Sequence, residues 1–303
     1  MRRTALLFAL CATIPLVACA PEAARDGAAD STRAFASDRI SVVTRGAGPD
    51  IILIPGLASH RDVWAGVADS LDDRYRLHLV QVNGFAGAAP GANADGPVSA
   101  PVAEEIARYI RESGLQRPAI IGHSMGGTIG MMLAARDTGT VGRLMVVDMV
   151  PFMGEMFGPA AATPEGLRKI ADGVRDTILT QPMGSNTSML EQAFSGMTRV
   201  PAMKDTLVQG VRASNKPTLA NAMRELIATD LRPELAHITA PVTVLYVYPA
   251  NIRMKPAEFD AATRKSWANV PNVRLVKIDN SNHFIQFDQP ARFVAEVDAF
   301  MRR

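Results

Sequence analysis

From Ile40 onwards, short runs of apolar residues alternate with segments whose apolar residues recur every three or four positions. Short continuous apolar runs predict buried strands, and the longer spacing predicts amphipathic helices. The runs that predict strands are ISVVTRG, DIILIPG, YRLHLVQVN, PAIIGHS, VGRLMVVDMV, PVTVLYVY and NVRLVKID. Because helical segments separate most of them, the sequence predicts an α/β fold with a doubly wound, mostly parallel sheet.

The alternation stops between Pro151 and Asp230, where helical segments broken by Gly and Pro follow one another without a strand. We expect residues 151–230 to be a helical lid inserted between two core parts, 38–150 and 231–303. The insertion holds seven of the 15 methionines. Methionine fills irregular apolar gaps, so these residues fit either adaptable core packing or a soft cover over a binding pocket.

The first residues, MRRTALLFALCATIPLVACA, place two arginines before an apolar run that is short for a membrane span. Its end, Leu16-Val17-Ala18-Cys19, resembles the bacterial lipobox. The resemblance implies a signal peptide over residues 1–18, lipid on Cys19 and a flexible tether over 19–37. Ala20 favours the outer membrane, so we expect a lipid-anchored protein of the bacterial cell envelope that faces the periplasm.

The formal net charge is +2, and Arg2 and Arg3 of the predicted leader account for it, so the rest of the chain is about neutral. The chain has no basic stripe, so we do not expect nucleic acid as a partner. The two cysteines, Cys11 and Cys19, both belong to the N-terminal segment. No disulfide or thiol chemistry is therefore expected in the body of the protein.

Gly122-His123-Ser124-Met125-Gly126 lies where an apolar strand passes into a helix. This stretch resembles the nucleophile elbow, G-x-S-x-G, of the α/β-hydrolases. In that turn the serine adopts a strained backbone conformation, and the glycines leave room for the neighbouring strand and helix. The resemblance covers residues 40–303 and implies that Ser124 is the nucleophile.

The resemblance also implies which residues form the rest of the catalytic site. His283 follows the last predicted strand, in NHFIQFDQP, and would be the base that activates Ser124. The Met125 N–H and the Leu57 N–H, in the loop LIPGLASH, would form the oxyanion hole. Pro55 stands where the family usually has histidine, which leaves the backbone donor of Leu57 in place.

Several residues are candidates for the acid that should orient His283. The usual position, after the strand that follows the lid, reads Tyr248-Pro249-Ala250-Asn251 and has no carboxylate. Asp148, at the end of LMVVDMV, is the first candidate, because adjacent strands lie about 4.8 Å apart. The other candidates are Asp260, Asp279, Asp230, Asn251 acting as a neutral amide, and a serine–histidine dyad with water.

We therefore expect a single-domain serine hydrolase that cleaves small-molecule carboxylic esters of apolar acyl or aryl type through an acyl-enzyme. Phe85, Met153 and Phe157 are expected to line its pocket. No metal or organic cofactor is expected, because the chain has no metal-binding or phosphate-loop motif. The alternatives are a lactonase, a thioesterase, an acyltransferase, or a binding protein that kept the fold without catalysis.

Overall fold

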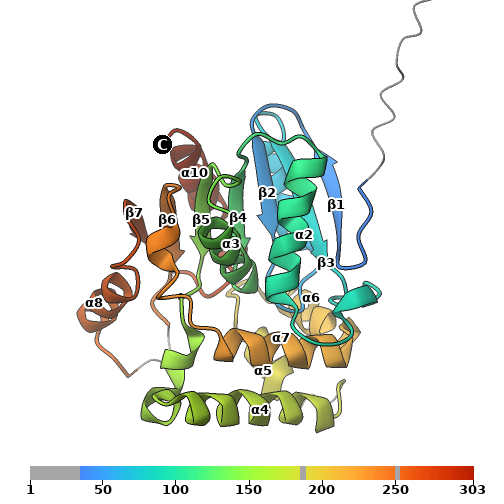
Figure 1. Cartoon of the computed structure of the whole chain (residues 1–303), viewed down its shortest axis with the longest axis vertical. Coiled ribbons are helices and arrows are strands. Elements are labelled where there is room, and N and C mark those ends of the chain that lie inside the picture. Colours follow the sequence, from blue (N-terminus) through green and yellow to red (C-terminus); the bar gives the residue numbers. More distant parts are fainter. Residues whose placement is uncertain (1–34, 185–188, 250–252) are drawn as a thin grey trace, which may run out of the picture. The chain divides into compact units, whose positions relative to one another are not determined.

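One seven-stranded sheet organises the chain in the computed structural model, which describes residues 35–184, 189–249 and 253–303 (Figure 1). The strands are β1 (Ile40–Arg45), β2 (Asp50–Ile54), β3 (Arg76–Val82), β4 (Ala119–His123), β5 (Arg143–Val147), β6 (Val242–Tyr246) and β7 (Val273–Lys277). Their order is β1-β3-β2-β4-β5-β6-β7, and only β1 runs antiparallel to its neighbour. The predicted fold class is confirmed.

Helices cover both faces of this sheet, which is why its central strands are apolar at successive positions. In β2, for example, Ile51 to Ile54 are all fully buried. Figure 1 shows α2 and α3 on one face and α10 behind the other. The core helices are α1 (Ala65–Leu71), α2 (Ser99–Glu112), α3 (Met125–Arg136), α8 (Pro256–Ser266), α9 (Ile285–Asp288) and α10 (Pro290–Met301), with short 3-10 turns η1 (Arg61–Trp64), η2 (Gly91–Asn93) and η4 (Leu235–His237).

Between β5 and β6 the chain forms a run of helices. They are η3 (Met153–Ala161), α4 (Pro164–Thr180), α5 (Met189–Ser195), α6 (Pro201–Ala213) and α7 (Lys216–Ala228). The ends of this helical insertion lie side by side, because Leu231 N donates to Pro151 O at 3.0 Å and Phe152 pairs with Asp230. Figure 1 shows α4, α5, α6 and α7 gathered beyond one edge of the sheet.

Contacts from α7 and from α6 help to fasten the insertion to the core. The Glu225 carboxylate of α7 accepts the Val98, Ser99 and Ala100 N–H groups at 2.7, 2.6 and 3.0 Å. These donors lie at the N-terminus of α2, where a negative charge is favourable. In addition, a Cβ on Gly210 of α6 would lie 2.5 Å from Ala58 O, so α6 packs directly on the loop after β2.

The described part of the chain begins at Phe35, and the predicted signal peptide, Cys19 and most of the predicted tether lie outside it. Residues 35–37, the end of that predicted tether, are packed against α2. The Phe35 ring lies 5.0 Å from the Tyr109 ring, and Ala36 O accepts from Arg108 at 2.7 Å. The folded unit therefore starts earlier than expected. Among the described helices, none is long and apolar enough to cross a membrane.

Candidate active site

Six parallel strands end at one edge of the sheet, and the predicted site residues follow them there. Gly56 and Leu57 follow β2, Ser124 follows β4, Asp148 follows β5, and the loop with His283 follows β7. Residues from distant parts of the chain meet at such an edge because parallel strands all point the same way. The sheet thus brings together what the sequence separates by more than 200 positions.

Ser124 occupies a strained turn between β4 and α3, with φ 53° and ψ −121°. Left-handed φ values are costly for residues with a side chain and cluster at functional sites. A Cβ on Gly122 would lie 2.1 Å from Gly126 O, and one on Gly126 would lie 2.2 Å from Ile54 O. The elbow therefore requires both glycines, which confirms the steric reason predicted for them.

His283 and Asp148 face each other with Nδ1 and Oδ2 2.6 Å apart. Asp148 is held in place from β6: its Oδ1 accepts Val247 N at 3.1 Å and its own N–H donates to Leu245 O at 2.7 Å. A carboxylate at Nδ1 keeps the proton on that nitrogen and leaves Nε2 with a free lone pair. Nε2 is the atom that can accept a proton from a serine hydroxyl.

His283 lies against the residue that precedes Ser124, and within the described residues no hydrogen bond joins the side chains of Ser124 and His283. The ring of His123, the residue before Ser124, lies 4.6 Å from the His283 ring. His123 Nε2 is also 3.0 Å from His283 O. Contacts between nucleophile and base are often long without substrate and shorten when it binds.

His123 connects the elbow to the histidine loop, defined as residues 278–284. Its side chain is completely buried. Burial, followed by the nearby His283 ring, holds the pKa of His123 well below its ordinary value. The neutral ring therefore donates its Nε2–H to the carbonyl of His283. This contact holds the backbone of His283 beside the elbow.

The two predicted oxyanion donors lie beside the serine. A Cβ on Gly56 would lie 3.1 Å from Ser124 Cβ, so the loop after β2 passes directly over the elbow. This loop is a tight turn in which Ser59 N donates to Gly56 O at 3.3 Å. In the part of the chain that the structure describes, neither Leu57 N–H nor Met125 N–H has an acceptor. Both donors are thus free to bind an oxyanion.

None of the other acid candidates that the structure describes has a hydrogen bond or ion pair with the His283 side chain. Asp260 pairs with Lys277 at 2.8 Å, and that hydrogen bond holds its pKa below the ordinary value. Asp230 pairs with Arg232 at 2.6 Å at the base of the insertion. Asp279 is exposed, and Asn251 lies outside the described residues. Among the carboxylates described, only Asp148 has a hydrogen bond to His283.

The predicted pocket residues come from two segments at the same edge. Phe85 follows β3 and is fully buried, whereas Met153 and Phe157 are half-buried on η3 of the insertion. Their role as pocket walls stays a prediction. Away from this edge, His78 of β3 is buried between Asp50 at 2.8 Å and Tyr109 at 2.6 Å.

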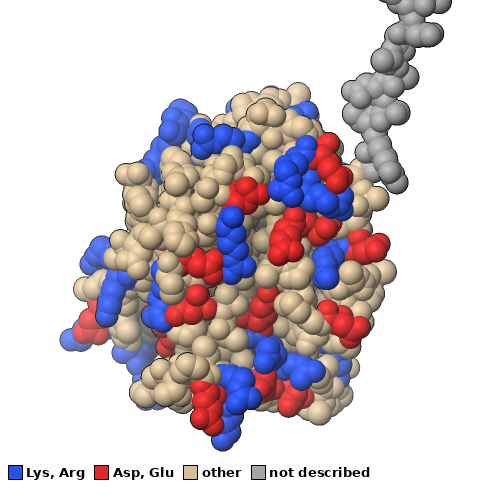
Figure 2. All heavy atoms as spheres, in the orientation of Figure 1, with Lys and Arg blue, Asp and Glu red and all other residues tan. Residues whose placement is uncertain are grey.

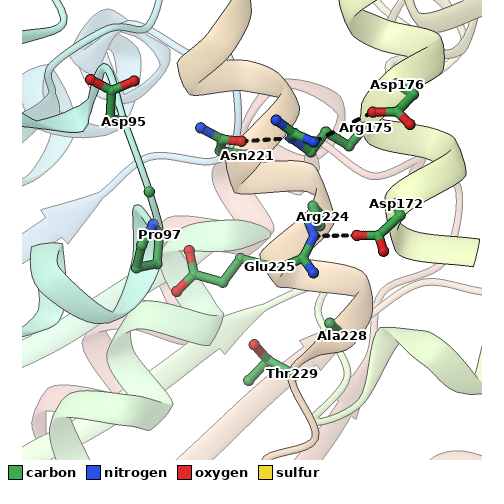
Figure 3. A pocket seen from close by; sticks show the side chains of 11 residues that line it. Asp95, Pro97, Asp172, Arg175, Asp176, Asn221, Arg224, Glu225, Ala228 and Thr229 are labelled. Carbon is green, nitrogen blue, oxygen red and sulfur yellow. Dashed lines mark hydrogen bonds and ion pairs between the residues drawn. The ribbon is translucent and has the colours of Figure 1, made fainter. Parts of the chain in front are cut away.

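A separate cavity of about 790 Å³ lies between α4, α7 and residues 95–97 (Figure 3). Its walls are charged, and the side chains pair across it: Arg224 contacts Asp172 at 2.5 Å and Arg175 contacts Asn221 at 3.0 Å. None of the predicted site residues lines it.

Figure 2 shows that acidic and basic residues are interspersed on the face of the molecule that it draws, so no patch of one sign on this face marks a polyanion site.

Comparison with known proteins gives concordant results. Residues 49–290 match the family model described as the alpha/beta hydrolase fold. A pimeloyl-[acyl-carrier protein] methyl ester esterase of Nitrosomonas europaea is 27% identical over 263 residues, covering 86% of this chain and 98% of that protein. One from Nitrosospira multiformis is 25% identical, covering 86% and 97%. The crystal structure of a hydrolase from Pseudomonas aeruginosa aligns with TM-score 0.70 at 20% identity, covering 86% and 94%, a likeness in fold.

Proposed function

The chain belongs to the α/β-hydrolase fold family, and we propose that it is a serine hydrolase that cleaves carboxylic esters through an acyl-enzyme. The observation that carries the proposal is the His283–Asp148 pair, 2.6 Å apart, beside a serine on a strained elbow. The partial burial of these groups at a sheet edge and the ester-cleaving relatives support it further. A binding protein would have no need of an oriented imidazole or of the strain at Ser124.

In the first step His283 Nε2 accepts the proton of Ser124 Oγ while the oxygen bonds to the ester carbonyl carbon. The carbonyl oxygen becomes an oxyanion, which the Leu57 and Met125 N–H groups stabilise. The imidazolium, held by Asp148, returns the proton to the departing alkoxide, and the alcohol leaves. Water then repeats the sequence on the acyl-enzyme, which releases the acid and restores Ser124.

For the substrate we propose a free ester with an apolar acyl or aryl group. The predicted walls Phe85, Met153 and Phe157 favour such a group. The two relatives are named for a methyl ester on an acyl-carrier protein. The predicted leader would take this chain out of the cytoplasm, which favours a small ester over one on an intracellular carrier.

We expect the purified protein to hydrolyse p-nitrophenyl and methyl esters and to be labelled at Ser124 by a fluorophosphonate. With an apolar acyl site, kcat/KM rises by up to about four-fold per added CH₂, because each contributes about 0.8 kcal/mol on burial. The measurement is a series from acetate to hexanoate with one leaving group. A fall at every added CH₂ would contradict the apolar site but not ester cleavage. Absence of both hydrolysis and label would contradict the enzyme and favour the binder.

For the N-terminus we propose a lipoprotein signal peptide over residues 1–18 and a lipid anchor on Cys19, supported by the lipobox resemblance. Several acyl chains would hold the protein on a membrane, since each buried CH₂ contributes about 0.8 kcal/mol. Expressed in a Gram-negative host with alkyne-labelled palmitate, the full chain is expected to carry label in the membrane fraction. Cys19→Ala removes the label and Cys11→Ala keeps it. Label retained in Cys19→Ala would refute the anchor.

A further inference from the structure

One carboxylate joins the histidine loop to the helical insertion. Asp288, at the end of α9, accepts Asn282 N through Oδ2 at 2.7 Å. Its other oxygen, Oδ1, accepts the Thr198 hydroxyl at 2.7 Å and the Arg199 N–H at 2.8 Å. Residues 196–199 connect α5 to α6, so these bonds cross from the core to the insertion. Hydrogen bonds to an ionised acceptor are stronger than neutral ones.

Two further hydrogen bonds run beside this carboxylate. Phe284 N donates to Met197 O at 3.0 Å, and Asn282 Nδ2 donates to Gly196 O at 3.0 Å. The residues on both sides of His283 are therefore attached to the connection 196–199. Thr198 is almost completely buried, so water does not compete easily for its hydroxyl.

We infer that Asp288 is a positioning residue, which sets the place of the His283 base by tying its loop to residues 196–199 of the insertion. The inference rests on the proposed function of His283. The Asp288 carboxylate and the insertion bind the backbone of the histidine loop, whereas Asp148 binds the imidazole ring of His283 itself. A motion of the insertion that keeps these hydrogen bonds either pivots about residues 196–199 or displaces the base. A substrate that shifts the insertion would therefore also shift His283, so that its fit changes kcat as well as KM.

The test compares isosteric pairs. Asp288→Asn replaces one acceptor oxygen by an amide donor, and Thr198→Val removes the hydroxyl at constant shape, whereas Thr198→Ser keeps it. We expect kcat for a p-nitrophenyl ester to fall about 10- to 100-fold in Asp288→Asn, because small misplacements of a catalytic group cost about that much. KM should stay within about three-fold. Thr198→Val lowers kcat in the same way, and Thr198→Ser restores it.

The control is Asp172→Asn, which breaks the ion pair between α4 and α7 seen in Figure 3 and should leave kcat unchanged. Fluorophosphonate labelling rates follow the same order as kcat. If Asp288→Asn and Thr198→Val lower only the unfolding temperature and keep the wild-type kcat, the inference is overturned while the proposed function stands. If Asp288→Asn does not fold, the Thr198 pair decides. A wild-type protein without hydrolysis or label would overturn both.

Discussion

Replacing Ser124 with alanine is expected to lower kcat/KM for a p-nitrophenyl ester by about 10⁵- to 10⁶-fold. Without Oγ no acyl-enzyme forms, and only substrate binding and the oxyanion donors remain to assist water. Ser124 already adopts φ 53°, a value that alanine tolerates no worse than serine, so the fold should be kept. Initial-rate kinetics, fluorophosphonate labelling and a thermal melt measure the three parts of this prediction.

Ser70→Ala is the matched control, because Ser70 is an exposed serine whose hydroxyl, among the residues that the structure describes, bonds only to Gly66 O of its own helix. It should keep both activity and label. Activity retained in Ser124→Ala would show that another group attacks the ester and would remove the basis of the mechanism. Product analysis with added alcohol separates a hydrolase from an acyltransferase, since only the latter transfers the acyl group preferentially to the alcohol.

The strands could be predicted from sequence because their apolar runs are continuous, but their order could not. β1 and β2 are joined only by residues 46–49, yet β3 lies between them in the sheet. A Cβ on Gly46 would lie 2.4 Å from Tyr75 O, and one on Gly48 2.5 Å from Arg74 O. Residues 46–49 therefore pack against the turn that precedes β3. No local sequence pattern predicts this contact. The packing of Phe35 and Ala36 on α2, at the end of the predicted tether 19–37, likewise joins distant segments and has no local pattern.

The site was predictable to the extent that its parts have a local signature. Ser124 has the glycine pattern of the elbow, and His283 has a fixed place after the last strand. Asp148 has no such signature, because its contact with His283 bridges 135 positions and depends on the pairing of β5 with β6. Asp288 was visible only as an acidic residue before Pro290, and its bonds to residues 198 and 199 required the fold.

Asp148→Asn is expected to lower kcat by about 10⁴-fold with little change in KM, as removal of a triad carboxylate does. The amide keeps the size of the side chain and can still accept Val247 N through its oxygen. Its NH₂ group would then face His283 Nδ1 as a donor. That contact favours the tautomer with the proton on Nε2, which cannot accept the proton of Ser124.

Asp260→Asn is the matched comparison, because it changes a carboxylate that was also a candidate acid but is bound to Lys277 and Tyr246. It should keep kcat within about two-fold, since its partners lie outside the Asp148–His283 pair. Unfolding temperatures of both variants close to that of the wild type would exclude a general loss of structure. A large loss in Asp260→Asn together with a small one in Asp148→Asn would reverse the assignment, and the carboxylate bonded to Nδ1 would then be a structural partner of the histidine.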